Sequence, residues 1–272
     1  MPRNASREPA PRKALGQHFL RDSGVLADIV AAVRVPPGGL VVEIGPGTGV
    51  LTGALLDAGH EVLAIEIEER MLVHLRKRFA GHPRLTLVQG DGRDIKLHEL
   101  VPAGRPFVVA SNLPYFAANP IVRNLLEGYT KPKEMVVMVQ REVARRIAAA
   151  PGKQSLLGIS VFVYAQPTLL FDVPPEAFDP PPQVWSSVLR LSLRESPLVP
   201  VERLDDFFDL VVKTFRNPRK HLHNAVARGV WLPPGGARDA LVAAGIDPMR
   251  RPETLTVEEW LTLLEATEAI RG

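Results

Sequence analysis

The sequence predicts an α/β protein: a parallel sheet covered by helices on both faces, followed by a small domain made only of helices. Short β-branched runs alternate with helical patterns up to about residue 194, and such alternation is typical of a parallel α/β sheet. The runs are almost continuously apolar, as expected for strands buried on both faces. From residue 195 onward only helical periodicity remains.

The composition is that of an ordinary globular protein. The chain has 272 residues, 46% hydrophobic and 23% charged, enough for one large domain and a smaller one. It has no cysteine, which excludes disulfides, thiolate metal sites and a thiol nucleophile. The basic start of the chain lacks the apolar run of a signal peptide, and no apolar segment approaches the roughly 18 residues of a spanning helix. We expect a cytoplasmic protein with no membrane partner and no metal.

The chain divides into three predicted segments. Residues 1–20 form a basic, proline-containing arm. Residues 21–194 form the α/β domain. The stretch E-S-P-L-V-P-V-E-R then introduces a helical domain of residues 195–272.

The elements of the α/β domain follow in order. The first is a helix that Asp22 or Ser23 can cap and that V-P-P-G-G ends. Strands are expected at Leu40–Ile44, Val62–Ile65, Leu85–Val88, Phe107–Ala110 and Met135–Val139. Helices are expected at Leu51–Ala58, Glu69–Phe79, Asn119–Glu127 and from about Arg141.

The remaining elements close the sheet and form the last domain. Thr168–Val173 and Ser187–Leu193 are expected to be a late strand pair. Helices of the last domain are expected at Phe207–Phe215, Lys220–Arg228, Ala237–Ala244 and Val257–Ala266.

The stretch V-V-E-I-G-P-G-T-G-V-L-T (Val41 to Thr52) predicts a strand, a glycine turn and the start of a helix. Gly45, Gly47 and Gly49 would let the backbone approach a ligand without interference from a Cβ atom. The third glycine of a dinucleotide fingerprint is missing, because Val50 stands there, and no Walker-type G-K-[ST] follows. A glycine turn alone can also be purely structural.

Polar side chains follow the next strands. Glu66 ends the second strand, where a carboxylate can accept hydrogen bonds from both hydroxyls of a ribose. Asp91, in Q-G-D-G-R-D, follows the third strand, where it can accept an adenine exocyclic amine. Asn112 follows the fourth. Each has a structural alternative, but together they lie at the carboxyl edge of the sheet, where open α/β sheets bind ligands.

The glycine turn with its following acids resembles the S-adenosylmethionine site of class I methyltransferases, which have a Rossmann-like fold. The resemblance implies S-adenosylmethionine as the cofactor and S-adenosylhomocysteine as its product. It also implies that Glu43, Gly45, Gly47 and Gly49 belong to the donor site. This ligand has a ribose and an adenine but no pyrophosphate, so the dinucleotide glycine pattern is unnecessary.

The stretch N-L-P-Y (Asn112 to Tyr115) resembles the [DNS]-P-P-[YF] motif of enzymes that methylate exocyclic amines. Adenine N6 is a poor nucleophile, because its lone pair is delocalised into the ring. The Asn112 side-chain oxygen and the Leu113 carbonyl would accept both N6 hydrogens and free that lone pair. Pro114 would fix the direction of the carbonyl, and Tyr115 would stack on the base.

Further motifs resemble the ribosomal RNA adenine dimethyltransferases, specifically their bacterial small-subunit members. These motifs are G-Q-H-F-L (Gly16 to Leu20), F-D-P-P-P-Q-V-W-S-S (Phe178 to Ser187), F-R-N-P-R-K-H-L-H-N (Phe215 to Asn224) and G-I-D-P-M-R-R-P-E-T-L-T-V-E-E-W (Gly245 to Trp260). The resemblance implies dimethylation of N6 on two adjacent adenosines in a hairpin loop near the 3′ end of small-subunit (16S) rRNA, during biogenesis of the 30S subunit.

The same resemblance assigns further site residues. His18 and Leu20 match donor contacts, together with Gly45, Glu66, Asp91 and Asn112. Phe178 would pack on the target base opposite Tyr115, or else serve as a core aromatic. The family usually has Asn where this chain has His18, so either the imidazole or the main chain would make that contact.

Clusters of basic residues support RNA binding independently of the family resemblance. They lie in the arm (Arg3, Arg7, Arg12, Lys13), around the expected helix from Arg141 (Arg141, Arg145, Arg146) and before the helix at Lys220 (Arg216, Arg219, Lys220). Phosphate contacts would make binding salt-dependent, and a solvated helix face is the alternative for each cluster. The expected partner is small-subunit rRNA within a pre-30S or 30S particle, bound by a monomer.

Three other functions compete with this hypothesis. A large-subunit rRNA adenine methyltransferase would share the catalytic motifs, but R-P-E-T-L-T-V-E-E-W argues against it. A DNA adenine methyltransferase would need a target-recognition insertion, which is not evident. A non-catalytic RNA-binding assembly factor would not need Glu66, Asp91 and N-L-P-Y intact.

Overall fold

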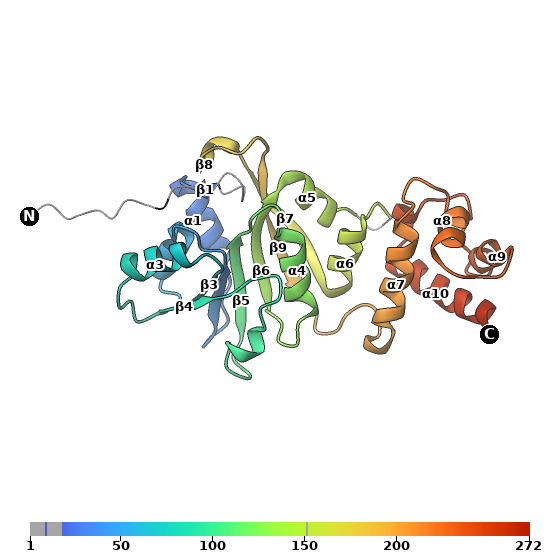
Figure 1. Ribbon diagram of the computed structural model, residues 1–272, viewed down its shortest axis with the longest axis horizontal. Coiled ribbons are helices and arrows are strands. Elements are labelled where there is room, and N and C mark those ends of the chain that lie inside the picture. Colours follow the sequence, from blue (N-terminus) through green and yellow to red (C-terminus); the bar gives the residue numbers. More distant parts are fainter. Residues whose placement is uncertain (1–8, 10–17, 151) are drawn as a thin grey trace, which may run out of the picture. The chain divides into compact units, whose positions relative to one another are not determined.

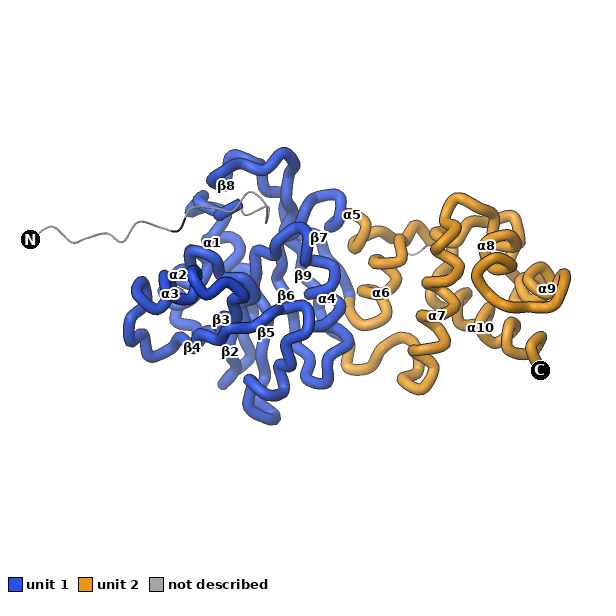
Figure 2. Tube along the Cα trace, in the orientation of Figure 1, with its two compact units in different colours: residues 1–144, 166–193 blue, residues 145–165, 194–272 orange. Residues whose placement is uncertain are grey.

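The computed structural model describes residues 9, 18–150 and 152–272. The basic arm predicted at residues 1–20, with Arg3, Arg7, Arg12 and Lys13, therefore lies almost entirely outside the described residues. The chain divides into two compact units (Figure 2). Unit 1 consists of residues up to 144 and 166–193, and unit 2 of residues 145–165 and 194–272.

The described part of unit 1 is built on a seven-stranded sheet with the order β4-β3-β2-β5-β6-β9-β7. β2 to β6 pair with one another in parallel, whereas β9 runs antiparallel to β6. The strands are β2 (Leu40–Ile44), β3 (Val62–Glu66), β4 (Leu85–Gln89), β5 (Phe107–Asn112), β6 (Glu134–Gln140), β7 (Ala165–Val173) and β9 (Ser186–Leu193). The predicted α/β class and the parallel pairing of β2 to β6 are confirmed, and β9 makes the sheet mixed.

Helices connect these strands, as Figure 1 shows. They are α1 (Ser23–Ala32), α2 (Val50–Asp57), α3 (Glu69–Arg78), α4 (Ala118–Glu127) and α5 (Arg141–Ile147). Asp22 caps α1 by accepting hydrogen bonds from the backbone of Gly24 and Val25. β2 and β3 are buried along their whole length, because helices cover both faces of a parallel sheet. The predicted strands β2 to β6 lie within two residues of their observed ends.

One strand pair was not predicted. β1 (Phe19–Leu20) pairs antiparallel with β8 (Phe178–Asp179), with Leu20 opposite Phe178. Strands of two residues carry no periodicity that a sequence could show. The pair joins the G-Q-H-F-L and F-D-P-P-P motifs, which are about 160 residues apart along the chain.

The described part of unit 2 is helical. Its elements are α6 (Leu156–Tyr164), α7 (Leu204–Phe215), α8 (Leu222–Gly229), α9 (Gly236–Ala243) and α10 (Val257–Arg271). α10 packs on α7 and α9, and α8 packs on α7 and α9. Short 3-10 turns in the two units are η2 (Leu97–Glu99), η3 (Pro175–Ala177), η4 (Val201–Arg203) and η5 (Pro252–Thr254). No helix in the described residues has both the length and the apolarity needed to cross a membrane.

α6 groups with the C-terminal helices, although the sequence assigned residues 145–165 to the α/β domain. Two backbone hydrogen bonds explain this grouping: Arg194 N–H donates to the Tyr164 carbonyl at 2.9 Å, and Leu198 N–H donates to the Val163 carbonyl at 2.9 Å. Phe208 of α7 also stacks on Tyr164, with ring centroids 6.1 Å apart. The functional division at residues 194 and 195 stays a prediction.

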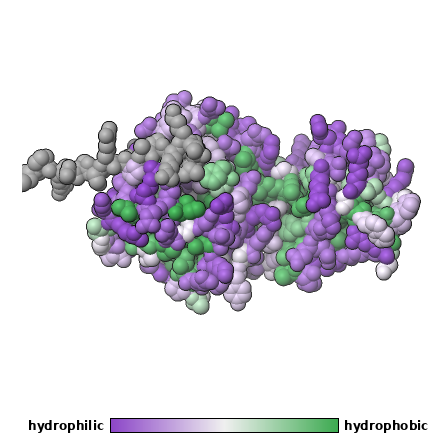
Figure 3. All heavy atoms as spheres, viewed as in Figure 1, coloured by the Kyte–Doolittle hydropathy of each residue, from purple (hydrophilic) through white to green (hydrophobic). Residues whose placement is uncertain are grey.

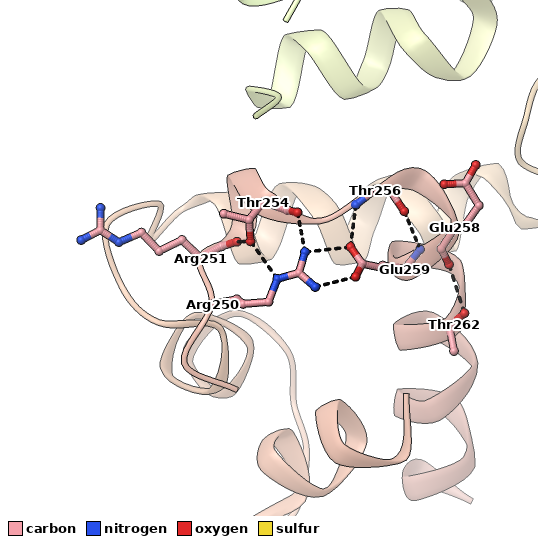
Figure 4. Close-up of polar contacts among 7 residues, drawn as sticks. All are labelled: Arg250, Arg251, Thr254, Thr256, Glu258, Glu259 and Thr262. Carbon is pink, nitrogen blue, oxygen red and sulfur yellow. Dashed lines mark hydrogen bonds and ion pairs between the residues drawn. The ribbon is translucent and has the colours of Figure 1, made fainter. Parts of the chain in front are cut away.

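The G-I-D-P-M-R-R-P-E-T-L-T-V-E-E-W motif forms a polar network at the start of α10 (Figure 4). Thr256 and Glu259 make a capping box, in which each side chain accepts from the other's backbone N–H. The Arg250 guanidinium donates to both Glu259 oxygens, at 2.5 and 2.9 Å, and to the Thr254 hydroxyl and carbonyl. One arginine thus fixes the preceding turn to the helix start.

We predict that Arg250→Ala lowers the free energy of unfolding at pH 7. Hydrogen bonds to charged groups contribute about 1.5–3 kcal/mol, and partial exposure reduces this to about 1–2 kcal/mol. Arg250 lowers the pKa of Glu259 below its ordinary value of 4.5. The stabilisation is therefore present above pH 4.5 and is lost as the pH falls through the folded-state pKa of Glu259.

Urea unfolding followed by circular dichroism at pH 7 and below pH 4 checks this prediction. The matched control is Arg251→Ala, because the Arg251 side chain points away from the network (Figure 4). Equal stability of the two variants at pH 7 would contradict the role given to Arg250.

Candidate functional site

The site lies where the sheet order changes direction. From β2, the chain adds β3 and then β4 on one side, and β5 and β6 on the other. Ligands of open α/β sheets bind at such a switch point, beyond the carboxyl ends of the strands. The pairing of β2 with β5 extends from Leu40–Phe107 to Val42–Val109. Beyond it, Ile44 N–H donates to the Ser111 hydroxyl at 2.8 Å instead of to a backbone carbonyl.

A cavity of about 330 Å³ lies at this point, within the roughly 300–1,000 Å³ of small-molecule sites. Most of the residues that the sequence assigned to the donor and the target base line this cavity. They are His18, Leu20, Glu43, Gly45, Gly47, Glu66, Asn112, Leu113, Pro114, Tyr115 and Phe178. The structure thus brings the G-Q-H-F-L, glycine-turn, N-L-P-Y and F-D-P-P-P motifs to one cavity.

Two predicted donor residues do not line the cavity. Gly49 adopts a φ of +80°, and a Cβ atom there would lie 2.6 Å from Leu75 of α3 and 2.7 Å from Phe79, the residue that follows α3. Gly49 therefore lets α2 and α3 approach each other, a packing reason for the glycine. Asp91 lies beyond the end of β4, where its carboxylate accepts from the Arg93 guanidinium at 2.5–3.0 Å. Arg93 itself lines the cavity.

Glu66 is held at the end of β3 by backbone hydrogen bonds. Its carboxylate accepts from Gly47 N–H at 3.1 Å and from Glu68 N–H at 2.9 Å. Burial raises the pKa of Glu66, and these two backbone bonds oppose the shift. A buried carboxylate with fixed oxygens is suited to accept from two neighbouring hydroxyl groups.

Glu43 lies buried beneath the glycine turn. Burial raises the pKa of Glu43 to about 8, the Thr52 hydroxyl opposes this by donating to the carboxyl group at 2.6 Å, and the charge of Glu66 adds to it. A cationic ligand in the cavity would favour the ionised forms of both acids. The acidic floor of the cavity is thus suited to a positively charged ligand.

The N-L-P-Y segment forms the wall that faces the glycine turn. A Cβ atom on Gly45 would lie 3.8 Å from Pro114, so the segment lies about one side-chain atom away from the turn. Leu113 N–H donates to the Met138 carbonyl of β6 at 3.1 Å, which fixes the backbone. Among the described residues, no hydrogen bond engages the Asn112 side chain or the Leu113 carbonyl. Both acceptors are therefore available to a ligand.

Aromatic residues form the remaining walls. The hydroxyl groups of Tyr115 and Ser186 are hydrogen-bonded at 2.7 Å, and burial raises the pKa of Tyr115. The His18 ring lies 5.8 Å from the Tyr115 ring, and its Nδ1–H donates to the Pro180 carbonyl at 2.7 Å. Nε2 is then the nitrogen that His18 can offer to a ligand. Phe178 lines the cavity but is only 4% exposed and packs in the core.

The basic residues that were predicted to bind RNA are divided between the two units. Arg141 is half-buried in unit 1, whereas Arg145 and Arg146 are exposed on the part of α5 in unit 2. Arg216, Arg219 and Lys220 are exposed between α7 and α8 of unit 2. Their exposure permits phosphate contact but does not test it.

Some residues of the cavity were not singled out from the sequence. Phe19, Thr48, Ile67, Arg93 and Phe116 belong to its lining. Phe19 and Phe116 adjoin predicted site residues, and Arg93 stands in Q-G-D-G-R-D, so their positions beside the motifs were the available signal. Ser186, which anchors Tyr115, stands in the F-D-P-P-P-Q-V-W-S-S motif, but its contact with Tyr115 could not be predicted, because it joins segments far apart in the sequence.

We predict that Glu43→Gln flattens the pH dependence of stability between pH 5 and 8. The unfolded chain loses the Glu43 proton near pH 4.5, whereas the folded protein keeps it until about pH 8. Stability therefore falls with rising pH in this window, by at most about 1.4 kcal/mol per pH unit for one group. The amide of Gln has no such titration.

Urea unfolding across this pH range checks the Glu43 prediction. The matched control is Glu99→Gln, because the Glu99 side chain is 60% exposed. An unchanged slope in Glu43→Gln would refute the assignment of a buried, protonated acid.

Comparison with protein families and curated proteins identifies relatives along almost the whole chain. The family model described as "Ribosomal RNA adenine dimethylase" matches residues 10–268. A protein of Dehalococcoides mccartyi named ribosomal RNA small subunit methyltransferase A is 40% identical over 252 residues, covering 93% of this chain and 87% of the relative. A protein of the same name from Alkaliphilus metalliredigens is 40% identical over 263 residues, covering 94% and 92%.

Two solved structures are similar over the same length. A dimethyladenosine transferase from Plasmodium falciparum has a TM-score of 0.76 at 27% identity, covering 93% of this chain and 98% of that one. The 23S rRNA methyltransferase ErmE has a TM-score of 0.70 at 28% identity, covering 92% and 99%. The architecture is thus that of a Rossmann-like class I methyltransferase with a helical C-terminal part. With a family model that spans residues 10–268, this chain belongs to the ribosomal RNA adenine dimethylase family.

Proposed function

We propose that the protein dimethylates N6 of two adjacent adenosines in a hairpin loop near the 3′ end of 16S rRNA, with S-adenosylmethionine as the methyl donor. The observation that carries the proposal is the single cavity in which two sets of groups meet. Glu43 and Glu66 form an acidic floor, and Asn112 with the Leu113 carbonyl supplies free acceptors on the wall beside it.

The floor of the cavity fits the donor. Bound S-adenosylmethionine supplies a methyl group on a positively charged sulfur. Glu66 would accept both ribose hydroxyls with the oxygens that Gly47 and Glu68 orient, while Glu43 would offset the positive charge. The backbone of Gly45 and Gly47 would contact the donor closely, and His18 and Leu20 would cover it.

Asp91 completes the donor site only if its carboxylate keeps a free lone pair. The Arg93 guanidinium binds both oxygens of Asp91 and lowers the pKa of that carboxyl group. An ionised carboxylate has about four acceptor positions, and the backbone N–H and guanidinium of Arg93 together make four contacts with Asp91. Asp91 would therefore accept an adenine amine by releasing one guanidinium contact. Arg93 would then hold Asp91 ionised and oriented.

The wall of the cavity performs the chemistry on the acceptor. The Asn112 side-chain oxygen and the Leu113 carbonyl would accept the two N6 hydrogens and direct the nitrogen lone pair at the methyl group. Pro114 fixes the carbonyl, and the Ser186 hydroxyl fixes the ring of Tyr115, on which the target base would stack. The methylated amine is acidic and can lose its proton to water, so the rate enhancement comes mainly from positioning.

The rRNA substrate follows from the family, and its finer identity is part of the proposal. The relatives at 40% identity are named for the small subunit, whereas ErmE, named for 23S rRNA, is 28% identical. This favours the small subunit over the large-subunit alternative. Free acceptors in N-L-P-Y favour an active enzyme over a non-catalytic assembly factor.

The context of the reaction is also part of the proposal. The exposed bases Arg145, Arg146, Arg216, Arg219 and Lys220 would contact phosphates of a pre-30S or 30S particle in the cytoplasm. Looped adenosines suit this pocket, because unpaired bases enter it without melting a helix. The proposal takes the enzyme to act as a monomer.

Asn112→Ala should lower kcat about 10²–10³-fold, the loss seen when one group that acts in the transition state is removed. Single-turnover methyl transfer at saturating donor and RNA measures this loss. Asn119→Ala is the matched control, since Asn119 is exposed in the first turn of α4. Retention of the full rate by Asn112→Ala would rule out its role on N6.

The substrate is tested by incubating the protein with labelled S-adenosylmethionine and unmethylated 30S subunits, followed by nucleoside mapping. We expect label only as N6,N6-dimethyladenosine at two neighbouring loop positions of 16S rRNA. Label in 23S rRNA or in DNA would overturn the proposed substrate, and no label in any of them would favour the assembly factor.

A further inference from the structure

Trp185, at the surface of unit 1, has an anchored backbone and lies beside a positively charged side chain. Most of the surface visible in Figure 3 is hydrophilic, with hydrophobic residues in small patches. Trp185 is 41% exposed and immediately precedes β9. The pairing of β6 with β9 ends at Gln140 and Ser186, and one further bond follows, in which Arg141 N–H donates to the Trp185 carbonyl at 2.9 Å. The backbone of Trp185 is therefore anchored to the sheet.

The side chain of Trp185 is anchored as well. The Arg141 guanidinium lies over its ring, 5.1 Å from the ring centroid, a cation–π contact that restricts both side chains. Among the described residues, no carboxylate forms an ion pair with Arg141. Its charge thus remains available to an anion beside the tryptophan ring.

This pair is linked directly to the base pocket. Ser186, the residue after Trp185, is hydrogen-bonded to Tyr115 at 2.7 Å. Tyr115 and Phe116 line the cavity, and Phe116 is itself strongly exposed. The exposed Trp185 ring lies beside the Arg141 cation, and the next residue, Ser186, is hydrogen-bonded to Tyr115 of the cavity. The ring is therefore placed to bind a group adjacent to the target base. A singly exposed hydrophobic residue would need none of these contacts.

We propose that Trp185 and Arg141 form a binding site for the unpaired purine nucleotide next to the target adenosine. Trp185 stacks on its base, and Arg141 binds its phosphate. The inference rests on the proposed function, since it takes a looped adenosine as the substrate. Insertion of one adenosine into the pocket unstacks its neighbour, and an aromatic platform restores that stacking. With two adjacent target adenosines, one occupies the platform while the other is methylated.

The test measures equilibrium binding of a hairpin RNA with two adjacent loop adenosines, by fluorescence anisotropy, in the presence of S-adenosylhomocysteine. Trp185→Ala should raise Kd about tenfold, as expected for loss of one base–aromatic stack, and Trp185→Phe should restore most of the affinity. Trp231→Ala is the control, because Trp231 is 80% exposed in unit 2, and its Kd should match the wild type. Equal Kd values for Trp185→Ala and wild type would overturn the proposal.

A second RNA separates stacking from a structural effect. When the neighbour of the target adenosine is abasic, wild type should lose the same tenfold and Trp185→Ala should lose nothing more. A tenfold difference that persists with the abasic RNA would assign Trp185 a merely structural role. Arg141→Gln should reduce the salt dependence of log Kd by about one phosphate contact, and an unchanged slope would remove Arg141 from the site.

Methyl transfer by the same variants distinguishes this proposal from the proposed function. At RNA concentrations below KM, methyl transfer by Trp185→Ala should fall about tenfold with the loss of RNA affinity, whereas Trp231→Ala should match the wild type. Absence of methyl transfer by wild type on every RNA would refute the function itself. A normal wild-type rate with no Trp185 effect on Kd would refute only the platform.

Discussion

Parallel pairing of β2 with β3 and with β5 places the carboxyl ends of these three strands at one edge of the sheet. The site depends on how the pairing of β2 with β5 ends. The Ser111 hydroxyl takes the N–H of Ile44 in place of a backbone carbonyl. The glycine turn after β2 and the N-L-P-Y segment after β5 can therefore both line one cavity, with Pro114 near Gly45. The donor-binding turn and the acceptor-binding segment lie side by side because β2 and β5 stop pairing before their ends.

Electrostatics divides that cavity into a floor and a wall. The floor holds two buried acids, Glu43 and Glu66, whose pKa values burial raises. Such groups cost free energy in the folded protein when ionised, and a cationic donor offsets this cost. The wall offers uncharged acceptors, Asn112 and the Leu113 carbonyl, which suit an amine that becomes positive only during transfer. The division matches a methyl group moving from a cationic sulfur to a neutral nitrogen.

Most of the fold and much of the site could be predicted, because both depend on local patterns. β2 was expected at Leu40–Ile44, where it lies, since its buried residues are continuous. α6 was missed, because Leu156–Tyr164 is apolar on all sides and shows no period. Gly49 was grouped with ligand-binding glycines, although its neighbours are Leu75 of α3 and Phe79, which directly follows that helix. Ser186 as the partner of Tyr115, and Arg93 as the partner of Asp91, could not be predicted from the sequence, because local patterns do not show which side chains meet.

We propose that N6 of the target adenosine binds between the Asn112 side chain and the Leu113 carbonyl. A structure of the protein with S-adenosylhomocysteine and the loop RNA measures this directly. We expect both oxygens within about 3.2 Å of N6, with the Tyr115 ring parallel to the base and the donor sulfur on the far side of the transferred methyl position. An adenosine whose N6 lies away from Asn112, with these acceptors bound to water, would contradict it.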